Sequence, residues 1–569
     1  MHGRARSHVL LAVLLACLAA GLLYPIALTI GGAFRSDDGS FTLHHVRSVF
    51  EEASTRRGLL NSALIAVLTT AAATALAVPV AVLVSRFAFP GRSLLRPLLL
   101  VPLVLPPFVG AIGVRHLFGR AGAVNALIGT DIDWLGQGGL PAIVAMEAVS
   151  LFPVLYLNVA AALANVDPAL EESARCMGAG PWARFRRVTL PLVRPGLFAG
   201  ATIVFIWSFT ELGTPLMFEF YDVTSVQILN GIREVEASHR PYALTAVMLA
   251  CSVAIYALGK AAFGRSAAAM QGKATVRRQE VELSGWRAAG ASSALAAVAA
   301  LAVLPAVALI LAAVTVPGQW YRSVLPQSFT MAHFGQALSH PLSAGSIRNS
   351  LLLSAVATAL ALGVGFLSAR LLVRARLRAA WALDALVMLP LAVPGLVLAF
   401  GYVAASLRWP FGGPEAPLGG VASILGAAPR PFAFLAVAYA VRRLPYVVRS
   451  AAAGLEQTSE ELEEAGRVAG GSRARVQWRI TVPLVAANLV AGALLAFSFS
   501  MLEVSDSLVL AQRESDYPVT KAIFTMYERL GDGPGIASAL GAWAMALLAV
   551  TLLGATVLLG KRMGALFRA

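Results

Sequence analysis

Three acidic residues lie in stretches of this sequence that are otherwise almost wholly apolar. Glu211 follows Ser208-Phe-Thr and Glu503 follows Ser500-Met-Leu, with the two acids 292 positions apart, and Asp506 comes three residues after Glu503. Because a charge buried in hydrocarbon is costly, such acids indicate a path that passes or gates a cation. On one helix, Glu503 and Asp506 would share a face. The interpretation that we favour over such a path is that the acids sit near the external helix ends and pair with arginine or backbone groups.

A short polar segment occurs twice. Residues 172–191 read ESARCMGAGPWARFRRVTLP and residues 464–483 read EAGRVAGGSRARVQWRITVP. In each copy a Glu is followed by two small residues, then by a Gly after three more, and finally by Pro, and all of these are 292 positions from their counterparts. Two copies on the same side favour two docking points for a partner. One copy alone would equally suit a plain connector, and the equal spacing could also be residual duplication.

Each copy is predicted to begin as a short capped helix. Asp167-Pro168 places an N-cap acid before a proline at the first helical position, and Thr458-Ser459-Glu460-Glu461 offers a capping box. Gly178 and Gly470 then release the chain from the helix. The result is a helix lying across one mouth of the molecule, with Ala, Met and Val side chains free to enter a partner's groove.

The elements that position these groups are membrane helices. The chain is 58% hydrophobic and 13% charged, whereas a soluble protein has about 25% charged residues. Three scattered cysteines provide neither a disulfide framework nor a metal cage. A membrane-crossing helix needs about 20 apolar residues, and the sequence holds twelve candidates, at 8–32, 60–84, 94–114, 141–163, 196–217, 242–263, 288–314, 350–372, 381–404, 431–455, 485–511 and 539–560.

Basic residues accumulate in alternate loops and so orient the chain. Lys and Arg are retained on the cytoplasmic side, which places both termini and both polar copies in the cytoplasm. The net charge of +15 then follows from topology and anionic headgroups. Nucleic-acid binding is disfavoured because the cations are spread over many loops. They include Arg86, Arg92, Arg96, Arg175, Arg184, Arg186, Arg187, Arg194, Arg265, Lys273, Arg277, Arg278, Arg287, Arg370, Arg374, Arg376 and Arg378.

The two halves of the chain correspond over most of their length. Six spans in each half with the same orientation predict a parallel repeat about an axis along the membrane normal. The first repeat covers residues 1–264, a basic cytoplasmic linker covers 265–287, and the second repeat covers 288–569. We therefore predict an all-α membrane protein of about twelve transmembrane helices in two parallel six-helix repeats.

Prolines occur at matching places in the two halves. Pro102 and Pro106 are each 288 positions from Pro390 and Pro394 and interrupt spans near mid-membrane. Such broken helices can line a transport cavity, or can equally be tolerated kinks. The counterpart of Glu147 in the second half is a tyrosine. We therefore expect Glu147 to form a structural hydrogen bond rather than to bind a ligand.

The repeated segment resembles the signature loop of the permease subunits of bacterial binding-protein-dependent ABC importers, and the resemblance covers essentially the whole chain. Ser173, Gly466, Val188 and Val482 are mild departures from the family pattern. In that family the loop forms a cytoplasmic coupling helix that seats in a cleft of the ATP-hydrolysing subunit. The resemblance therefore assigns ATPase docking to Glu172, Ser173, Ala174, Gly178, Glu464, Ala465, Gly466 and Gly470.

Fused two-half permeases of the ferric-iron type look most similar, on the segments 86–92, 105–111 and 442–449. The resemblance implies a multi-pass protein of the bacterial inner membrane that moves a small solute from a binding protein to the cytoplasm. Fe(III) is the first candidate for that solute. Similar permeases serve thiamine, 2-aminoethylphosphonate and polyamines. An acidic path suits Fe(III) or a polyamine, whereas a phosphonate would favour an arginine lining such as Arg442 and Arg443.

The sequence has no phosphate-binding loop of the GxxxxGK[ST] type, since Gly272-Lys273 is followed by Ala274. We therefore expect a non-catalytic subunit without a cofactor of its own and assign it no metal site. ATP and Mg would be bound by two partner ATPase subunits, a homodimer, while a soluble binding protein delivers the cargo. The alternative from another class is an ion-gradient-driven secondary transporter, which would need no cytoplasmic loop of fixed spacing.

Overall fold

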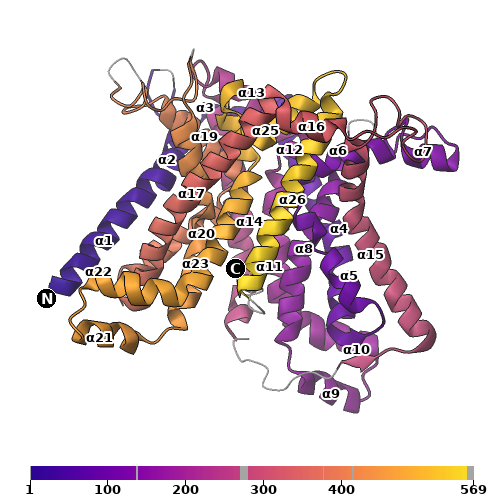
Figure 1. Ribbon diagram of the computed structural model, residues 1–569, viewed down its shortest axis with the longest axis horizontal. Helices are drawn as coiled ribbons and strands as arrows, with labels where there is room; N and C mark the ends of the chain where they lie inside the picture. The colour runs from indigo at the N-terminus through magenta and orange to yellow at the C-terminus, as the bar shows by residue number, and fades with distance from the viewer. Residues whose placement is uncertain are drawn as a thin grey trace.

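The computed structural model describes residues 2–36, 38–135, 139–269, 280–375, 377–412, 416–426 and 428–559. Within them, nine helices are long and apolar enough to cross a membrane, and two further helix pairs pass the same test together while bent by 106° and 105°. The long helices run side by side in one bundle, with short helices at its two ends (Figure 1). The predicted class, an all-α membrane protein, is confirmed.

The first half contributes six spans: α1 with η1 and α2, then α4, the bent pair α5 and α6, α8, α11 and α14. In the described part of this half, two π-helical segments, η1 and η3, and two 3-10 segments, η2 and η4, interrupt or follow α-helices. The elements of this half are α1 (His2–Leu18), η1 (Ala19–Leu23), α2 (Tyr24–Ala33), α3 (His44–Glu51), α4 (Ala53–Arg86), β1 (Phe87–Ala88), α5 (Arg92–Leu98), η2 (Val101–Leu103), α6 (Pro107–Phe118), α7 (Ala123–Ile128), α8 (Leu140–Ala164), α9 (Pro168–Cys176), α10 (Pro181–Arg184), η3 (Phe185–Thr189), α11 (Leu190–Phe209), α12 (Gly213–Met217), α13 (Thr224–Gly231), η4 (Ile232–Glu234) and α14 (Arg240–Ala269).

The second half repeats this order. Its elements are β2 (Val281–Glu282), α15 (Gly285–Ala313), α16 (Ala332–Ser339), α17 (Pro341–Arg374), α18 (Ala380–Ala392), α19 (Gly395–Ser406), α20 (Phe432–Glu456), α21 (Glu460–Val468), α22 (Arg473–Val476), η5 (Gln477–Thr481), α23 (Val482–Met501), α24 (Ser505–Leu510), η6 (Glu514–Asp516), α25 (Val519–Tyr527) and α26 (Gly533–Leu559). Helix α20 is not among the nine apolar helices and carries Arg442, Arg443 and Arg449. It packs against α17 as α8 packs against α4, and it completes six spans in this half.

The predicted proline breaks at Pro106 and Pro394 lie inside the third span of each half, whereas the predicted break at Pro390 is wrong, because α18 continues through it to Ala392. Helix α6 has Pro106 as its N-cap residue and Pro107 at its start, and α19 has Pro394 as its N-cap residue. Proline lacks an N–H and disfavours helix in the residue before it, so the chain turns sharply at both places. The two bends differ by only one degree, and each half therefore carries the same interruption.

The first helix of each half packs on the broken span of the other half. Helix α2 contacts α19 and α1 contacts α18, while α15 contacts both α5 and α6. Two equivalent glycines permit this close approach: a Cβ on Gly113 would lie 2.5 Å from the Leu309 nitrogen, and one on Gly401 would lie 2.7 Å from the Pro25 carbonyl oxygen. The sequence repeats are thus interlocked in space rather than set side by side.

The segment predicted as a linker is partly ordered into the neighbouring elements. Helix α14 runs to Ala269, and α15 already begins at Gly285. Between them β2 pairs in parallel with β1, and Glu280 receives two hydrogen bonds from the Arg92 guanidinium, at 2.6 and 2.7 Å. We call this the linker clip. The predicted basic residues that lie outside the described residues are Lys273, Arg277, Arg278 and Arg376.

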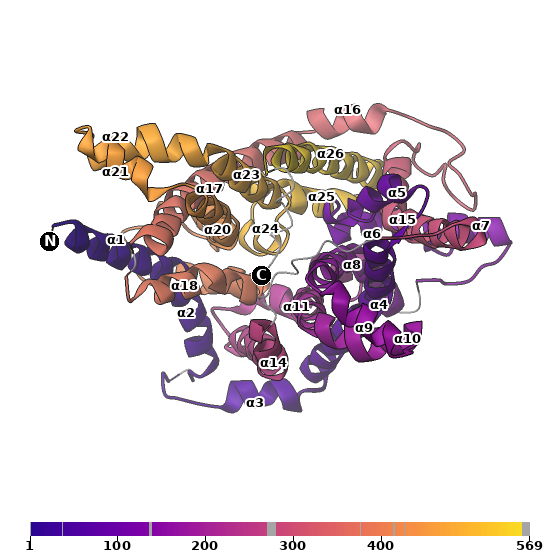
Figure 2. The same ribbon diagram turned by 90° about the horizontal axis from the view of Figure 1, so that it is seen from below.

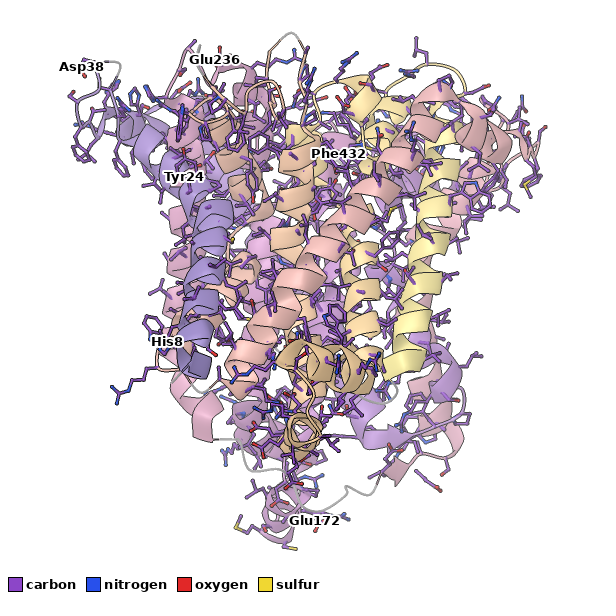
Figure 3. The ribbon with its side chains drawn as sticks, turned by 60° about the vertical axis from the view of Figure 1, so that its left-hand side comes forward. His8, Tyr24, Asp38, Glu172, Glu236 and Phe432 are labelled. Carbon is purple, nitrogen blue, oxygen red and sulfur yellow. The ribbon has the colours of Figure 1, made fainter. Side chains whose placement is uncertain are left out.

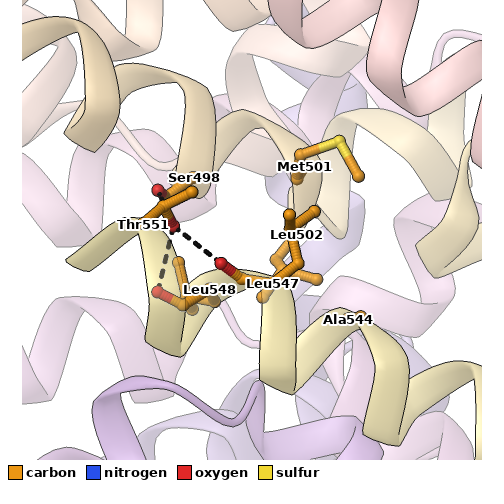
Figure 4. Close-up of a pocket in the computed structure, with 7 residues that line it drawn as sticks. All are labelled: Ser498, Met501, Leu502, Ala544, Leu547, Leu548 and Thr551. Atoms are coloured by element: carbon orange, nitrogen blue, oxygen red, sulfur yellow. Dashed lines mark hydrogen bonds between the residues drawn. The ribbon is translucent and has the colours of Figure 1, made fainter. Parts of the chain in front are cut away.

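A small recess lies between α23 and α26 (Figure 4). The Ser498 hydroxyl donates to the Thr551 hydroxyl at 2.6 Å across it. Because the remaining lining is apolar, we regard this recess as a contact that joins the two helices. It is lined by Ser498, Met501, Leu502, Ala544, Leu547, Leu548 and Thr551.

Candidate docking loops and transport pathway

The two copies of the repeated segment form equivalent helical loops at one end of the bundle. In the first, the Asp167 side chain caps α9 by accepting a hydrogen bond from the Ala169 amide at 3.0 Å, and Gly178 follows the helix with a φ of +83°. A positive φ favours glycine, which explains the glycine of the motif. Figure 1 shows α9 and α21 at the same end, and Figure 2 places them on opposite sides of the bundle.

The second loop is built in the same way, with one difference from the prediction. The Ser459 side chain accepts a hydrogen bond from the Glu461 amide at 3.2 Å, and Gly470 has a φ of +84°. The predicted capping box, with Thr458 as the N-cap and Glu461 as its acidic partner, is wrong. The helix begins one residue later, so its third position is Leu462, whose side chain accepts no hydrogen bond.

Of the eight residues predicted to dock an ATPase, six are exposed and two lie against the rest of their loop. Figure 3 shows Glu172 at the tip of the molecule. Ala174 is 5% exposed, and a Cβ on its counterpart Gly466 would lie 2.5 Å from the Ile480 side chain. Small residues at these two positions therefore let each helix close on its own loop. The exposed six are Glu172, Ser173, Gly178, Glu464, Ala465 and Gly470.

Each copy of the repeated segment, which we call a docking loop, presents large apolar side chains to the outside. These include Trp182, 71% exposed, in the first loop and Trp478, 69% exposed, in the second. Met177 is 81% exposed and Val468 is 89% exposed. Each lies beside the charged residues of its helix, so the exposed surface combines an apolar knob with acidic and basic groups. That combination suits a groove on a partner protein.

Two arginines to which the sequence analysis gave no role in these loops connect the loops to the bundle. Arg86, at the end of α4, pairs with Glu171 of α9, and Arg374, at the end of α17, lies near Glu463 of α21. The signal in the sequence was the equal spacing of the two arginines and of the two acids, Glu171 and Glu463, between the halves. The role of these acids was missed because each directly precedes the motif Glu and so looks like part of the same acidic first turn.

Glu211 and Glu503 occupy equivalent breaks in the fifth span of each half, between α11 and α12 and between α23 and α24. The prediction that Glu503 and Asp506 share a helical face is wrong, because the helix is interrupted between them and Asp506 belongs to α24. Both carboxylates nevertheless approach one guanidinium, that of Arg442 on α20.

The Glu503 carboxylate contacts two guanidinium groups. Arg442 and Arg443 each donate a hydrogen bond to it, and Arg442 is also 3.4 Å from Asp506. The Glu503 and Asp506 side chains are 5% and 0% exposed. A Cβ on Gly395, at the broken span α18–α19, would collide with the Arg442 guanidinium. The cluster therefore joins the two interrupted spans of the second half.

Glu211, the counterpart of Glu503, is held differently. One carboxylate oxygen accepts hydrogen bonds from the Gly213 and Thr214 amides, at 3.2 and 3.3 Å, and so caps α12. In the described part of the chain Glu211 forms no ion pair. Nearby Glu147 is fully buried and accepts hydrogen bonds from Ser208 and from Thr69. The two halves thus place matching acids in unlike surroundings.

No group of three or more His, Cys, Asp or Glu side chains among the described residues is arranged to hold a metal ion. The cation path through Glu211, Glu503 and Asp506 stays a prediction. Figure 3 shows acidic Asp38 and Glu236 at the end of the molecule opposite Glu172.

Comparison with known proteins places these features in a family. The chain is 28% identical over 452 residues to a probable ABC transporter permease protein, y4fN, of Sinorhizobium fredii, covering 77% of this chain and 76% of that protein. It is 26% identical over 435 residues to a putative ferric transport system permease protein of Haemophilus influenzae, covering 73% of this chain and 64% of that relative.

A third relative is shorter. The molybdenum transport system permease protein ModB of Escherichia coli is 37% identical over 139 residues, which cover 24% of this chain and 59% of ModB. The family model for the inner membrane component of binding-protein-dependent transport systems matches twice, at residues 73–321 and 361–564. Since each match contains one docking loop, the internal repeat is a repeat of the family's own unit. The chain is a multi-pass inner-membrane protein and belongs to the family of binding-protein-dependent transport system inner membrane components.

Proposed function

We propose that this chain is the membrane subunit of an ATP-driven importer, and that two ATPase subunits, identical to each other, bind α9 and α21. The observation that carries the proposal is the pair of equivalent capped helices at one end, each with an exposed motif Glu and an exposed apolar knob. One kind of cleft could bind both helices, because both have the same length of nine residues. ATP and Mg bind to the partners, and this chain is non-catalytic.

The docking helices face the cytoplasm in this proposal, as do both chain termini. Arginines support that orientation: Arg86, Arg184, Arg374 and Arg473 lie at the ends of elements next to α9 and α21. Cytoplasmic loops retain such cations. A soluble binding protein would then deliver cargo to the opposite end.

Fe(III) is the proposed cargo, as the name of the Haemophilus relative suggests for that protein. Glu211, which forms no ion pair among the described residues, supports a cationic cargo. An anionic cargo is less well served, because Arg442 and Arg443 both already donate to Glu503. Molybdenum, named for ModB, and 2-aminoethylphosphonate, thiamine or polyamines are the alternatives that a cargo screen must include. An ion-gradient-driven transporter is the alternative from another class.

The test is a pull-down of ATPase subunits with the tagged chain from detergent-solubilised membranes. We expect an ATPase to co-purify, and the double variant Glu172→Lys with Glu464→Lys to lose it, because charge reversal opposes docking at both exposed sites. Glu461→Lys is the matched control, since this exposed acid lies on α21 but outside the motif.

The control variant Glu461→Lys should still co-purify with the ATPase. An intact, monodisperse chain without any ATPase, and with transport that continues after ATP is depleted, would instead establish the gradient-driven alternative. Purified binding protein can then be screened against Fe(III), molybdate, polyamines, thiamine and 2-aminoethylphosphonate.

A further inference from the structure

A closed triangle of hydrogen bonds ties the first docking loop to the bundle. The Arg86 guanidinium, at the end of α4, donates to the Glu171 carboxylate on α9 and to the Thr189 hydroxyl at 2.7 Å. The Thr189 hydroxyl in turn donates to Glu171 at 2.5 Å. The Arg86 and Glu171 side chains are 15% and 9% exposed, and Thr189 is fully buried. Three elements, α4, α9 and η3, therefore meet at one point.

The second half has the same three residue types at the equivalent positions, but there the triangle is open. Arg374, Glu463 and Thr481 are the counterparts. The Arg374 Nε is 3.8 Å from Glu463 Oε1, which is beyond hydrogen-bond distance. These two atoms and the Thr481 hydroxyl are all buried without a hydrogen-bond partner. The polar atoms left unsatisfied belong to the three residues that are joined in the first half.

Other groups hold the second arginine in place. Its Nη2 donates to the Leu455 and Thr458 carbonyl oxygens, at 2.9 and 2.7 Å, and its Nη1 donates to the Glu460 carboxylate at 3.2 Å. Arg370, one turn earlier on α17, lies 3.7 Å from Glu463. Arg374 therefore binds the end of α20 and the first turn of α21 in the open arrangement.

A buried polar atom without a partner raises the free energy of the state that contains it. Closing the second triangle would give partners to three such atoms, but would pull Arg374 away from the end of α20. The two arrangements exchange one set of hydrogen bonds for another, so neither is favoured by a large margin. Such an element can be switched by a modest force on the docking helix.

We propose that these residues form two latches, Arg86–Glu171–Thr189 and Arg374–Glu463–Thr481, which transmit movement of the docking loops to the second span of each half. The structure shows the first latch closed and the second open. Closing the second latch pulls α17 towards η5 and α21, and opening it returns Arg374 to the end of α20. The proposal rests on the function proposed above, since the moving force comes from the ATPase subunits.

Thr481→Val tests the second latch with little risk to the fold. In the open arrangement the Thr481 hydroxyl makes no hydrogen bond, so its removal spares this state and affects only the closed one. Thr358→Val is the matched control, because Thr358 is another buried hydroxyl on α17 without a hydrogen-bond partner and belongs to no latch. Thr481→Ser keeps the hydroxyl and serves as the rescue variant.

The measurements are ATPase co-purification and ATP turnover of the full complex in proteoliposomes with its binding protein. We expect Thr481→Val to co-purify normally and to lower binding-protein-stimulated turnover at least about five-fold, because the closed state would lose both hydrogen bonds that the equivalent Thr189 hydroxyl makes. Thr358→Val and Thr481→Ser should match the unmodified chain. Wild-type turnover in Thr481→Val would overturn the latch.

A second measurement reports the geometry directly. In a chain with Cys17, Cys176 and Cys251 replaced by Ser, the pair Arg370→Cys with Gln477→Cys spans α17 and η5, whose side chains meet at these positions, and leaves all three latch residues in place. This pair should cross-link several-fold more in the complex after a non-hydrolysable ATP analogue is added. Unchanged cross-linking, with the ATPase still bound, contradicts the latch alone. Failure of the unmodified chain to bind any ATPase contradicts the proposed function instead.

Discussion

At the scale of single residues, the two halves give matching acids different partners. Glu503 faces Arg442 and Arg443, whereas Glu211 accepts hydrogen bonds from backbone amides. The difference arises because α20 carries two arginines where α8 has Ser150 and Leu151. The two equivalent acids thus have unlike charge surroundings, and among the described residues only the acid of the first half is without an ion pair.

This asymmetry predicts unequal costs for the same substitution. Glu503→Gln leaves two largely buried guanidinium groups without their shared carboxylate, and we expect it to lower the free energy of unfolding by about 3 kcal/mol. Glu211→Gln keeps an oxygen that can accept the same amide hydrogen bonds, so its cost should be under about 1 kcal/mol. Thermal unfolding of both variants in one detergent measures the difference. Equal shifts would show that Arg442 and Arg443 do not depend on Glu503.

The linker clip makes a prediction about pH. Hydrogen bonds from Arg92 hold the pKa of the Glu280 carboxyl below its ordinary value. A lowered pKa in the folded state contributes stability above the unfolded pKa, and that contribution is lost as the pH falls through the lowered value. We expect protection of the Leu283 amide, which donates to the Ala88 carbonyl at 2.9 Å, to decline over that acidic range.

The matched variant separates the clip from general acid effects. Because Glu280 is partly exposed, Glu280→Gln at neutral pH should raise the hydrogen-exchange rate of the Leu283 amide only about two- to three-fold. The variant should show no further change from titration at position 280. An identical acid dependence in both proteins would assign the effect to another group.

At the scale of elements, close helix crossings interlock the halves. Gly401 lets α19 approach α2, and Gly113 lets α6 approach α15. Both glycines sit within helices, where glycine by itself is unfavourable. Their use is therefore explained by the backbone atoms of the neighbouring helix, which leave no room for a Cβ.

Replacing glycine by alanine should then change the free energy of unfolding in opposite directions at two positions. Gly401→Ala places a Cβ against the Pro25 carbonyl, and we expect it to destabilise the chain by about 1–3 kcal/mol. Gly363→Ala, on α17, meets no atom within 4 Å and should stabilise by about 0.5–1 kcal/mol through helix propensity. Thermal unfolding with tryptophan fluorescence compares the two. A stabilised Gly401→Ala variant would contradict the close crossing.

At the scale of the whole molecule, the swapped first helices join the two repeats. Helices α1 and α2 complete the surface of the second half, and α15 completes that of the first. A half on its own would expose the apolar faces that these helices cover. The fused chain therefore behaves as one cooperative body, which suits a machine driven from two docking points.

Splitting the chain between residues 274 and 275 should show this dependence. We expect the two fragments, co-expressed with a tag on one, to purify together, because the swapped helices bury apolar surface against the other half. The first fragment expressed alone should aggregate. Size-exclusion chromatography distinguishes the outcomes, and a monodisperse first fragment would contradict the interlocked arrangement.

Interactions between residues close together in the sequence determined the secondary structure and the loop geometry of this protein. The apolar spans, the caps at Asp167 and Ser459, the left-handed glycines Gly178 and Gly470 and the proline breaks all follow from residues near each other in the chain. The family model's two matches confirm the repeat that the equal spacing predicted.

Tertiary structure decided the contacts between residues far apart in sequence. The Arg442–Glu503 pair joins positions in different spans, the latches join α4 to α9 and α17 to α21, and the first helix of each half crosses to the other. A single sequence states spacing along the chain but not which polar groups meet once the helices pack. For the same reason Glu503 and Asp506, expected on one helix, are separated by a break and meet instead at a guanidinium.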